Sequence, residues 1–496
     1  MKRDLRWHEF IPINIYWFGF NVASGSITPV LLPFLVALFV PAELKNTYLA
    51  NIRVISLALA MLAQPVAGML SDRSTNPLGR RRPYIIGGTV ANLLFLFVIG
   101  LSPLFAGLTW EGFFLSGVSV AYIVLLVGIV LLQVSSNVAL GAVLGLIPDL
   151  VPEHQRGRAS GVKAVMELLP GFVLIVAGPL VDSGRIWLLI GLIMVALLVT
   201  MLITVLAVHE KPLREEPKGG IGELILRLVG LTVIFVAATR FGVGMVRYSG
   251  TLLSLWGADV TMQVAFVGLA GLLGMAGSIF VGVYLGAWVG IGRDAPKQKS
   301  FIWWVINRLL FLAAVGSIQG FAQFFFADVL HVPNAATMTT VLLAVVAVFL
   351  IASALGSGYL ADRIGRKRLV GLSALVAAAG TLLLLMVREL PLVIAAGSII
   401  GAGAGTFMST NWALGTDLAP PDEAGRYLGI SNLAGAGAGI VGTGIGGPMA
   451  DQFNGLRPGL GYLVIFGLYG ILFLLSAVAL TRVKPPAASY GPSNGA

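Results

Sequence analysis

The chain of 496 residues contains no cysteine and only four histidines, and just 11% of its residues are charged. The missing cysteines exclude disulfides, thiolate chemistry and cysteine metal sites. The histidines are scattered along the chain, so a histidine metal cluster is not expected. No nucleophile with a nearby base stands out either. We therefore expect a protein that is not an enzyme and that binds no cofactor and no metal.

Hydrophobic residues make up 57% of the chain, above the roughly 45–50% that is usual in soluble domains. Runs of about 20 apolar residues, the length that a bilayer core requires of a helix, recur along nearly the whole sequence. Helices are required because an open strand would leave backbone groups unpaired in lipid. We predict an all-α membrane protein. The predicted spans are about 14, at residues 10–39, 47–70, 83–102, 119–148, 159–181, 186–208, 228–250, 262–290, 302–328, 337–360, 369–387, 391–417, 427–450 and 460–481.

The formal net charge of +10 would fit a nucleic-acid partner. Whether it indicates one depends on where the basic residues lie along the chain. Short cytoplasmic loops of membrane proteins carry an excess of Lys and Arg. With the amino terminus inside, most of the 32 basic residues fall in cytoplasmic segments. The external segments then hold Lys45, Arg185, Arg388 and Arg457, and the spans hold Arg53, Lys163, Arg227, Arg240, Arg247 and Arg308. The pattern predicts a multi-pass protein of the cell membrane with both termini cytoplasmic and no nucleic-acid partner.

Two loop motifs occur twice. "GMLSDRSTNPLGRRR" (68–82) and "GYLADRIGRKR" (358–368) share a Gly, an Asp-Arg pair, and a Gly before a basic run. "PDLVPEHQRGRASG" (148–161) and "TDLAPPDEAGRYLG" (416–429) align without a gap and place Asp149 on Asp417. Each motif follows the same span of its half. Parallel six-helix repeats of this kind are the architecture of a transporter with its site between the halves.

The repeat divides the chain into four regions. They are an N-terminal six-helix bundle (1–208), a cytoplasmic linker with an inserted transmembrane hairpin (209–300), a C-terminal six-helix bundle (301–483) and a disordered tail (484–496). In the hairpin, Gly282 and Gly286 form a GxxxG contact face. This face either binds a partner or packs on the hairpin's own bundle, and we favour the second interpretation.

These motifs resemble the major facilitator superfamily, whose loop between spans two and three carries Gly-x-x-x-Asp-Arg-x-Gly-Arg-Arg/Lys. "SDRSTNPLGRRRPY" (71–84) and "NVALGAVLGLIPDL" (137–150) are similar to the branch of sucrose–proton symporters and glycoside–pentoside–hexuronide symporters. Leu144 stands where the plant sucrose carriers have an arginine. The resemblance implies the major facilitator fold, two six-helix parallel-repeat bundles, and a secondary active transporter that works by alternating access.

The resemblance also implies a cytoplasmic gate whose charges bridge helices when the carrier faces outward and part when it opens inward. Partly desolvated ion pairs can form and break at modest net cost, because attraction and desolvation compete. The alternative is a plain orientation signal, which accounts for the arginines but not for the repeated Asp and Gly. The gate residues are Asp72, Arg73, Gly79, Arg80, Arg156 and Arg158 in the first half, and Asp362, Arg363, Arg366 and Arg426 in the second.

Proton coupling requires a titratable group inside the membrane, and ionisable residues there are functional candidates. Glu167 lies within span five, and Lys163 stands one turn before it on the same helix face. Asp149 is the second candidate, supported by the branch resemblance. The alternative is that Glu167 and Lys163 form a static pair and that Asp149 belongs to the gate.

Amide side chains recur at helical spacing inside the spans. A sugar requires amides for its hydroxyls and an aromatic face for its C–H side. The substrate-binding candidates are Asn21, Gln133, Asn137, Gln319 and Gln323; the alternative for each is a hydrogen bond between helices. We predict a transporter of a sugar or glycoside, with the proton as coupling ion and the lipid bilayer as surroundings. A proton-driven exporter of apolar compounds and a membrane assembly scaffold without transport are the alternatives.

Overall fold

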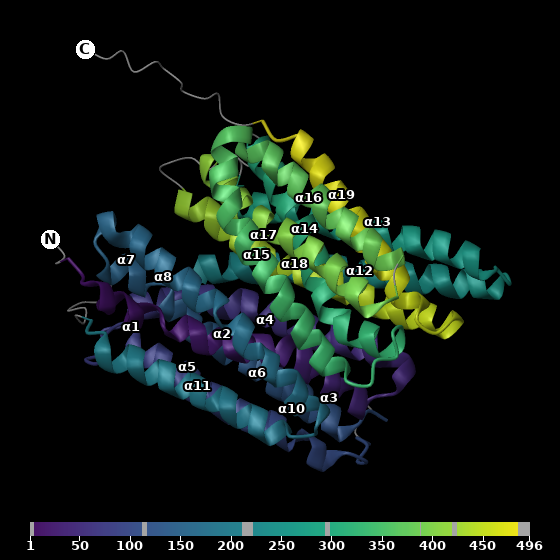
Figure 1. Cartoon of the computed structure of the whole chain (residues 1–496), viewed down its shortest axis with the longest axis horizontal. Coiled ribbons are helices and arrows are strands. Elements are labelled where there is room, and N and C mark those ends of the chain that lie inside the picture. Colours follow the sequence, from purple (N-terminus) through teal and green to yellow (C-terminus); the bar gives the residue numbers. More distant parts are fainter. Residues whose placement is uncertain are drawn as a thin grey trace.

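The computed structural model describes residues 4–111, 117–210, 222–292, 298–386, 388–418 and 424–484. Within these ranges, the side chains at 290, 291, 362, 424–430 and 432–434 are not described. Residues 211–221 of the predicted linker, residues 293–297 after the predicted hairpin, and all but the first residue of the predicted tail therefore lie outside the described residues. Figure 1 shows long helices in two groups, the first half below and the second half above.

The first half contains six spans. Their α-helices are α1 (Phe10–Asn14), α2 (Tyr16–Ser26), α3 (Leu32–Phe39), α4 (Lys45–Asp72), α5 (Arg82–Leu101), α6 (Val120–Val143), α7 (Leu146–Leu150), α8 (Arg156–Leu168), α9 (Pro170–Val173), α10 (Ala177–Asp182) and α11 (Ile186–Ala207). A π-helical turn at Ile27–Leu31 joins α2 to α3. Short 3-10 turns lie at Trp7–Glu9, Ala42–Leu44, Ser102–Phe105, Glu153–Gln155 and Leu174–Val176.

The described residues from 222 onward form eight long helices. They are α12 (Gly222–Leu255), α13 (Val260–Ile291), α14 (Lys299–Asp328), α15 (Ala335–Ile364), α16 (Arg366–Met386), α17 (Leu390–Leu418), α18 (Ala424–Leu456) and α19 (Leu460–Thr481). Among the described residues, 13 helical segments are long and apolar enough to cross a membrane. The 33-residue α18 corresponds to the remaining predicted span. The predicted all-α membrane fold is confirmed.

Spans one and five of the first half are interrupted, whereas their counterparts α14 and α18 run without a break for 30 and 33 residues. Pro29 lies in the π-helical turn of span one, and Pro170 begins α9 in span five. Proline removes a backbone donor and its ring clashes with the preceding turn, so it breaks or bends a helix. Interrupted helices are where transporters of this kind place their binding sites.

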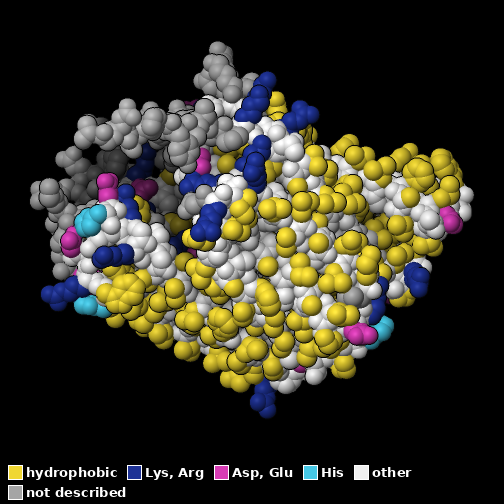
Figure 2. All heavy atoms as spheres, turned by 45° about the horizontal axis from the view of Figure 1, so that its top comes forward, with side chains coloured by type: hydrophobic (Ala, Val, Ile, Leu, Met, Phe, Trp, Pro, Cys, Tyr) yellow, Lys and Arg dark blue, Asp and Glu magenta, His cyan; other side chains and the backbone are white. Residues whose placement is uncertain are grey.

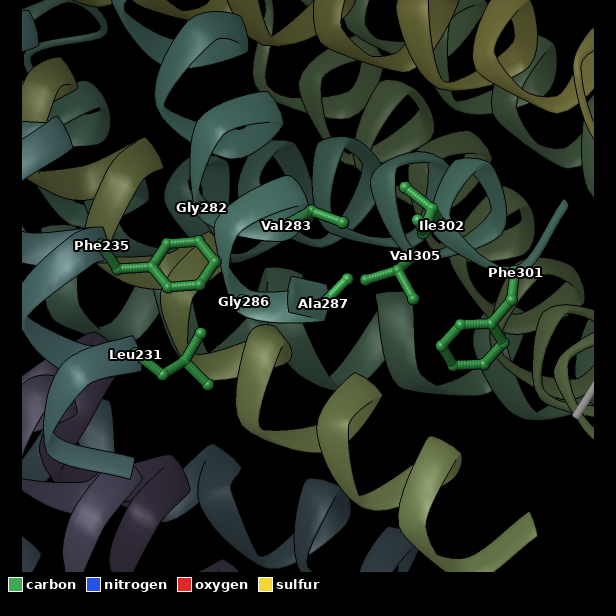
Figure 3. A pocket seen from close by; sticks show the side chains of 9 residues that line it. All are labelled: Leu231, Phe235, Gly282, Val283, Gly286, Ala287, Phe301, Ile302 and Val305. Carbon is green, nitrogen blue, oxygen red and sulfur yellow. The ribbon is translucent and has the colours of Figure 1, made fainter. Parts of the chain in front are cut away.

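The inserted hairpin, α12 and α13, packs against α18 and also contacts α4, α14 and α19. A Cβ added at Gly282 would lie 2.5 Å from the Phe235 ring, and one at Gly286 would lie 2.5 Å from Leu231. Figure 3 shows these two α12 side chains facing the glycines of α13, and the remaining cavity measures only about 10 Å³. The GxxxG face is therefore a contact between the two helices of the hairpin, whereas we expected it to pack on the bundle.

The described chain ends lie at the same end of the bundle. Asp4 contacts His154 at 3.0 Å in the first half, and the Lys484 backbone N–H donates to Ser300 Oγ at 3.1 Å in the second. We call this the Asp–Arg end, because it carries both repeated loops, and the other the opposite end. Between them Figure 2 shows a broad hydrophobic surface with charged side chains at its edges, as a bilayer requires.

Candidate transport site and its two ends

Arg81 is the centre of the charges at the Asp–Arg end of the first half. Its side chain is only 5% exposed and its guanidinium contacts Asp72, Asp149 (Nε to Oδ2, 3.0 Å) and the Ser71 hydroxyl (2.6 Å). Arg80 also pairs with Asp149, at 3.0 Å. The structure thus brings the predicted Asp72, Arg80 and Asp149 together. We did not predict Arg81 as a gate residue from the sequence. Its position in the basic run "GRRR" (79–82), next to the predicted Arg80, is the feature that could have identified it.

Gly79 and Glu210 hold this cluster in place. Gly79 has a φ angle of +114°. Residues with a Cβ atom rarely adopt this backbone conformation, whereas glycine adopts it readily. The Glu210 carboxylate lies against it and accepts the backbone N–H groups of Arg81 (2.8 Å) and Arg82 (3.4 Å). These donors are at the start of α5, where free N–H groups and the helix dipole favour an anion. Gly79 therefore has a structural reason for its place in the motif.

The second half repeats the pair with fewer partners. Arg366 Nη1 lies 2.7 Å from both carboxylate oxygens of Asp417, and both side chains are 42% exposed. Where the first half has Arg81, the second has Lys367, which donates to the Val483 carbonyl at 2.6 Å. Arg363 stacks on Tyr359, with its guanidinium 4.5 Å from the ring centre. The side chains of the predicted gate residues Asp362 and Arg426 lie outside the described residues.

Two further gate residues of the first half, Arg156 and Arg158, lie on α8. Arg156 pairs with Glu153 at 3.6 Å within its own turn, and Arg158 is exposed on α8. Arg73 directly follows α4. The pairs Arg81–Asp72, Arg80–Asp149, Arg156–Glu153 and Arg366–Asp417 each join residues of one half.

At the opposite end, two carboxylates reach across from one half to the other. Asp451 of α18 accepts the backbone N–H groups of Asn46 (3.1 Å) and Thr47 (2.7 Å) at the start of α4. Asp182 of α10 accepts those of Ala336 (3.3 Å) and Thr337 (2.7 Å) at the start of α15.

In both contacts the N–H donors are the second and third residues of the helix, which an N-cap side chain normally satisfies. The residues that precede α4 and α15 make no side-chain cap of their own. We call these two contacts the reciprocal caps, because span five of each half caps span two of the other.

Further polar groups support the cap on α4. Lys45 pairs with Asp328 at 2.7 Å, and the Tyr462 hydroxyl donates to Asp328 at 2.6 Å. The Asn46 side-chain amide donates to Asp451 at 2.8 Å. A Cβ at Gly447 of α18 would lie 2.6 Å from the Ala50 methyl group. The backbone of α18 therefore packs directly against α4, with no space for a side chain at Gly447. The opposite end is therefore closed.

Between the ends, the coupling candidates form one group. Glu167 lies 3.1 Å from Lys163, and both side chains are about a third exposed or less, at 33% and 27%. The Lys163 ammonium lies 4.2 Å above the Trp17 ring of α2. Glu167 stands three positions before Pro170, where span five is interrupted. Asp149 lies apart from this group, in the ion pairs of the Asp–Arg end.

The substrate-binding candidates have mixed surroundings. The Asn21 amide donates to Trp17 O and the Asn137 amide to Gln133 O, both at 2.8 Å and within their own helices. Gln319 is exposed on α14. With its amide nitrogen facing span one, Gln323 donates to the carbonyls of Pro29 (3.1 Å) and Val30 (2.8 Å). Gln323 therefore links the two halves.

Two cations inside the spans lack an acidic partner. Arg308 of α14 donates to Asn411 Oδ1 at 3.3 Å, and its guanidinium lies 5.0 Å from the Trp412 ring centre and 5.9 Å from that of Trp304. The Arg53 Nη1 atom is buried against α14 without a hydrogen-bond partner. No carboxylate lies within 4 Å of either residue in the described part of the chain. We predicted from the sequence that Arg53 and Arg308 lie inside spans, but we did not predict them as substrate-binding residues.

Both halves match models of transporter families. The family described as "Sugar (and other) transporter" matches residues 31–215, and "Major Facilitator Superfamily" matches residues 305–496. The chain is 29% identical over 174 residues to the general alpha-glucoside permease of Schizosaccharomyces pombe, which is 33% of this chain and 31% of that protein. It is 34% identical over 116 residues to the sucrose transport protein SUT1 of Oryza sativa subsp. japonica, covering 21% and 20%. The matches thus span a third or less of those relatives.

The fold is similar to that of the crystal structure of a D-xylose-proton symporter. The TM-score is 0.59 at 17% identity, and the likeness covers 96% of this chain and 97% of the other. This likeness confirms the predicted major facilitator fold. The matched families and relatives are transporters and not enzymes, which agrees with the sequence prediction.

Proposed function

We propose that this chain, which belongs to the major facilitator superfamily, carries a sugar or glycoside across the cell membrane in symport with protons. The match of residues 31–215 to the sugar transporter model carries the proposal. The partial matches to alpha-glucoside and sucrose carriers support the same substrate class. The interrupted spans one and five support a site between the halves that the first half lines in part, because they leave backbone groups available in mid-membrane.

We propose alternating access as the mechanism. The reciprocal caps close the opposite end, and the charge pairs of the Asp–Arg end stay within each half; both observations support a state that is open toward the Asp–Arg end. In the other state the caps separate, and the gate charges join the halves. That set comprises Asp72, Arg73, Gly79, Arg80, Arg156, Arg158, Asp362, Arg363, Arg366 and Arg426. The ion pairs of Asp149 favour a place for it in this gate.

The proposed sugar site lies between α2, α6, α14 and α17. Asn21, Gln133, Asn137, Gln319 and Gln323 supply amides to hydroxyl groups. Arg308 adds guanidinium donors that no carboxylate occupies, and Trp412 beside it offers a ring face to the C–H side of a sugar. The variant Arg308→Gln tests this site directly. It removes the guanidinium donors, so it should raise the KM for the sugar while leaving folding intact.

The test of the function is uptake by the purified chain in liposomes, with a panel of radiolabelled sugars and glycosides. We expect accumulation of at least one of them when the outside is more acidic than the inside, and only equilibration without a pH gradient. Accumulation without any pH dependence would contradict proton symport. No sugar transport, with export of apolar dyes instead, would contradict the substrate class.

Glu167 is the proposed proton carrier. Glu167→Gln keeps the shape but cannot change charge, so sugar exchange between equal pools should survive while uphill uptake fails. The double variant Lys163→Met with Glu167→Gln removes the unpaired ammonium and should fold better, yet still not accumulate sugar. Glu223→Gln is the matched control, because Glu223 pairs with Arg227 at the same helical spacing on exposed α12. Full accumulation by the double variant would exclude Glu167 and favour Asp149.

The proposed orientation places the Asp–Arg end and both termini in the cytoplasm. Because the chain has no natural cysteine, single cysteines can be labelled without background. Ser254→Cys, near the end of α12, should react only with reagents outside the cell, and exposed Ser160→Cys on α8 only with reagents inside. A Ser254→Cys variant that reacts only from the cytoplasm would contradict the two-span hairpin.

A further inference from the structure

The seam between the inserted hairpin and the second half contains two apolar grooves. One has a volume of about 430 Å³ and is lined by Gly277 and Phe280 of α13, Leu310 of α14, and Leu475 and Val478 of α19, with Arg482 at its end. The other, of about 530 Å³, is lined by Gly268, Leu385 and Leu463 among others. Both volumes fall within the roughly 300–1,000 Å³ of ligand pockets.

The two grooves lie in opposite leaflets. Arg482 directly follows the last residue of α19, so the first groove opens toward the Asp–Arg end. Leu385 lies at the end of α16 and Leu463 at the start of α19, so the second groove lies near the opposite end. We call them the Asp–Arg groove and the opposite groove.

Glycines keep both grooves open. A Cβ added at Gly277 or at Gly268 would meet no atom within 4 Å. This differs from Gly282 and Gly286 on the same helix, where the space is filled by α12. The hairpin therefore uses some of its glycines for packing and leaves others facing empty apolar volume.

One basic residue, Arg482, lines the end of the Asp–Arg groove, and three lysines lie close to it in the structure. The Arg482 guanidinium lies 5.9 Å from the ring centre of Trp303, which also lines the groove. Lys484 is tied to the start of α14 through Ser300, beside Lys299, and Lys367 donates to the Val483 carbonyl. None of these four cations has an acidic partner within 4 Å in the part of the chain described here. The lining of the opposite groove includes no charged residue.

We propose that the Asp–Arg groove is a binding site for an anionic phospholipid. One acyl chain lies along Gly277, Phe280 and Leu475, and the phosphate contacts Arg482 and Lys484 at the membrane surface. The apolar lining matches a hydrocarbon chain, the unpaired cations match a phosphate, and Trp303 lies at the depth where interfacial aromatic residues occur. The lipid would fix the hairpin to the second half, which gives the inserted helices a role that transport itself does not explain.

The test is lipid binding to the purified full chain, measured by native mass spectrometry with phosphatidylglycerol and phosphatidylcholine of identical acyl chains. Each basic group near a membrane surface strengthens the attraction of an anion about fivefold. We therefore expect wild-type protein to prefer phosphatidylglycerol by roughly 25-fold at one site, because two cations attract its net negative charge and the choline group of phosphatidylcholine cancels that charge. The double variant Arg482→Gln with Lys484→Gln should lose most of that preference and still bind phosphatidylcholine.

Two glycine variants separate the grooves. Gly277→Leu adds a side chain at a position of the Asp–Arg groove where a Cβ meets no atom within 4 Å, and it should remove the site that prefers phosphatidylglycerol. Gly268→Leu adds a side chain to the opposite groove in the same way and should leave that preference unchanged. Equal binding of the two lipids by wild type, or an unchanged preference in the double variant or in Gly277→Leu, would overturn the proposal. A wild-type dimer that Gly277→Leu converts to a monomer, with no change in lipid preference, would identify a second copy of the chain as the occupant instead.

Discussion

At the Asp–Arg end each half pairs its own charges, whereas at the opposite end each half caps a helix of the other. Arg81 and Arg366 contact carboxylates of the same bundle. Asp182 and Asp451 reach across to α15 and α4. A contact within one half moves with that half and need not break when the halves rotate. The reciprocal caps must break. We therefore expect the first kind of contact to stabilise each bundle, and the second to stabilise the proposed state that is closed at the opposite end.

The largest effect should follow from Arg81→Met. It leaves Asp149 and the half-exposed Asp72 without their central partner, and breaking such a buried pair costs about 3 kcal/mol of unfolding free energy. Arg366→Met removes the corresponding exposed pair and should cost about 1 kcal/mol or less. Unfolding of the purified variants in detergent measures both values. Equal losses would mean that the two clusters are equivalent despite their different burial.

A smaller effect, on the transport state and not on folding, should follow from Asp182→Ala combined with Asp451→Ala. Each lost cap weakens the closed opposite end by about 1 kcal/mol, so opening there should increase roughly fivefold for each and 25-fold for both. The alkylation rate of Ala50→Cys, at a position buried between α4 and α18, measures the opening.

Asp259→Ala is the control for the caps. Asp259 accepts the Met262 N–H at 3.0 Å and thus caps α13 within its own hairpin, at the same end of the molecule. Its loss should leave the alkylation rate unchanged. An equal rise in the control and in the double variant would contradict the assignment of the reciprocal caps to the transport state.

The smallest effect should follow from Asp451→Asn or Asp182→Asn alone. Both oxygens of each aspartate accept a backbone N–H, so asparagine keeps one bond of the cap and loses the other together with the negative charge at the helix start. The loss of one such hydrogen bond costs about 1 kcal/mol, which predicts roughly a fivefold rise in the alkylation rate for either variant. A rise with only one of them would show that the two caps are not equivalent.

The sequence predicted the parts of this arrangement that repeat. The alignment of Asp149 with Asp417 identified two acidic residues that both pair with the first arginine after a loop glycine. The apolar runs predicted the spans, because a bilayer imposes one length on every helix. The hairpin also follows from the run length and the charges that flank it.

The sequence could not predict the contacts that depend on how helices rotate and which helices meet. Three arginines in a row do not reveal that Arg81, and not its neighbours, is buried against Gly145. The reciprocal caps join residues 404 and 155 positions apart, and no local pattern links them. Arg308 was visible as a charge in an apolar run, but its position beside Trp412 depends on the packing of α14 on α17.

In the proposed alternating-access mechanism, the reciprocal caps also turn four backbone amides into reporters of the transport cycle. The amide hydrogens of Asn46, Thr47, Ala336 and Thr337 are held by carboxylates of the other half. They can exchange with solvent deuterium only when the halves separate at that end. Their exchange rates therefore measure how often the transporter opens there, without any probe or label. A transported sugar that speeds the cycle should raise all four rates together.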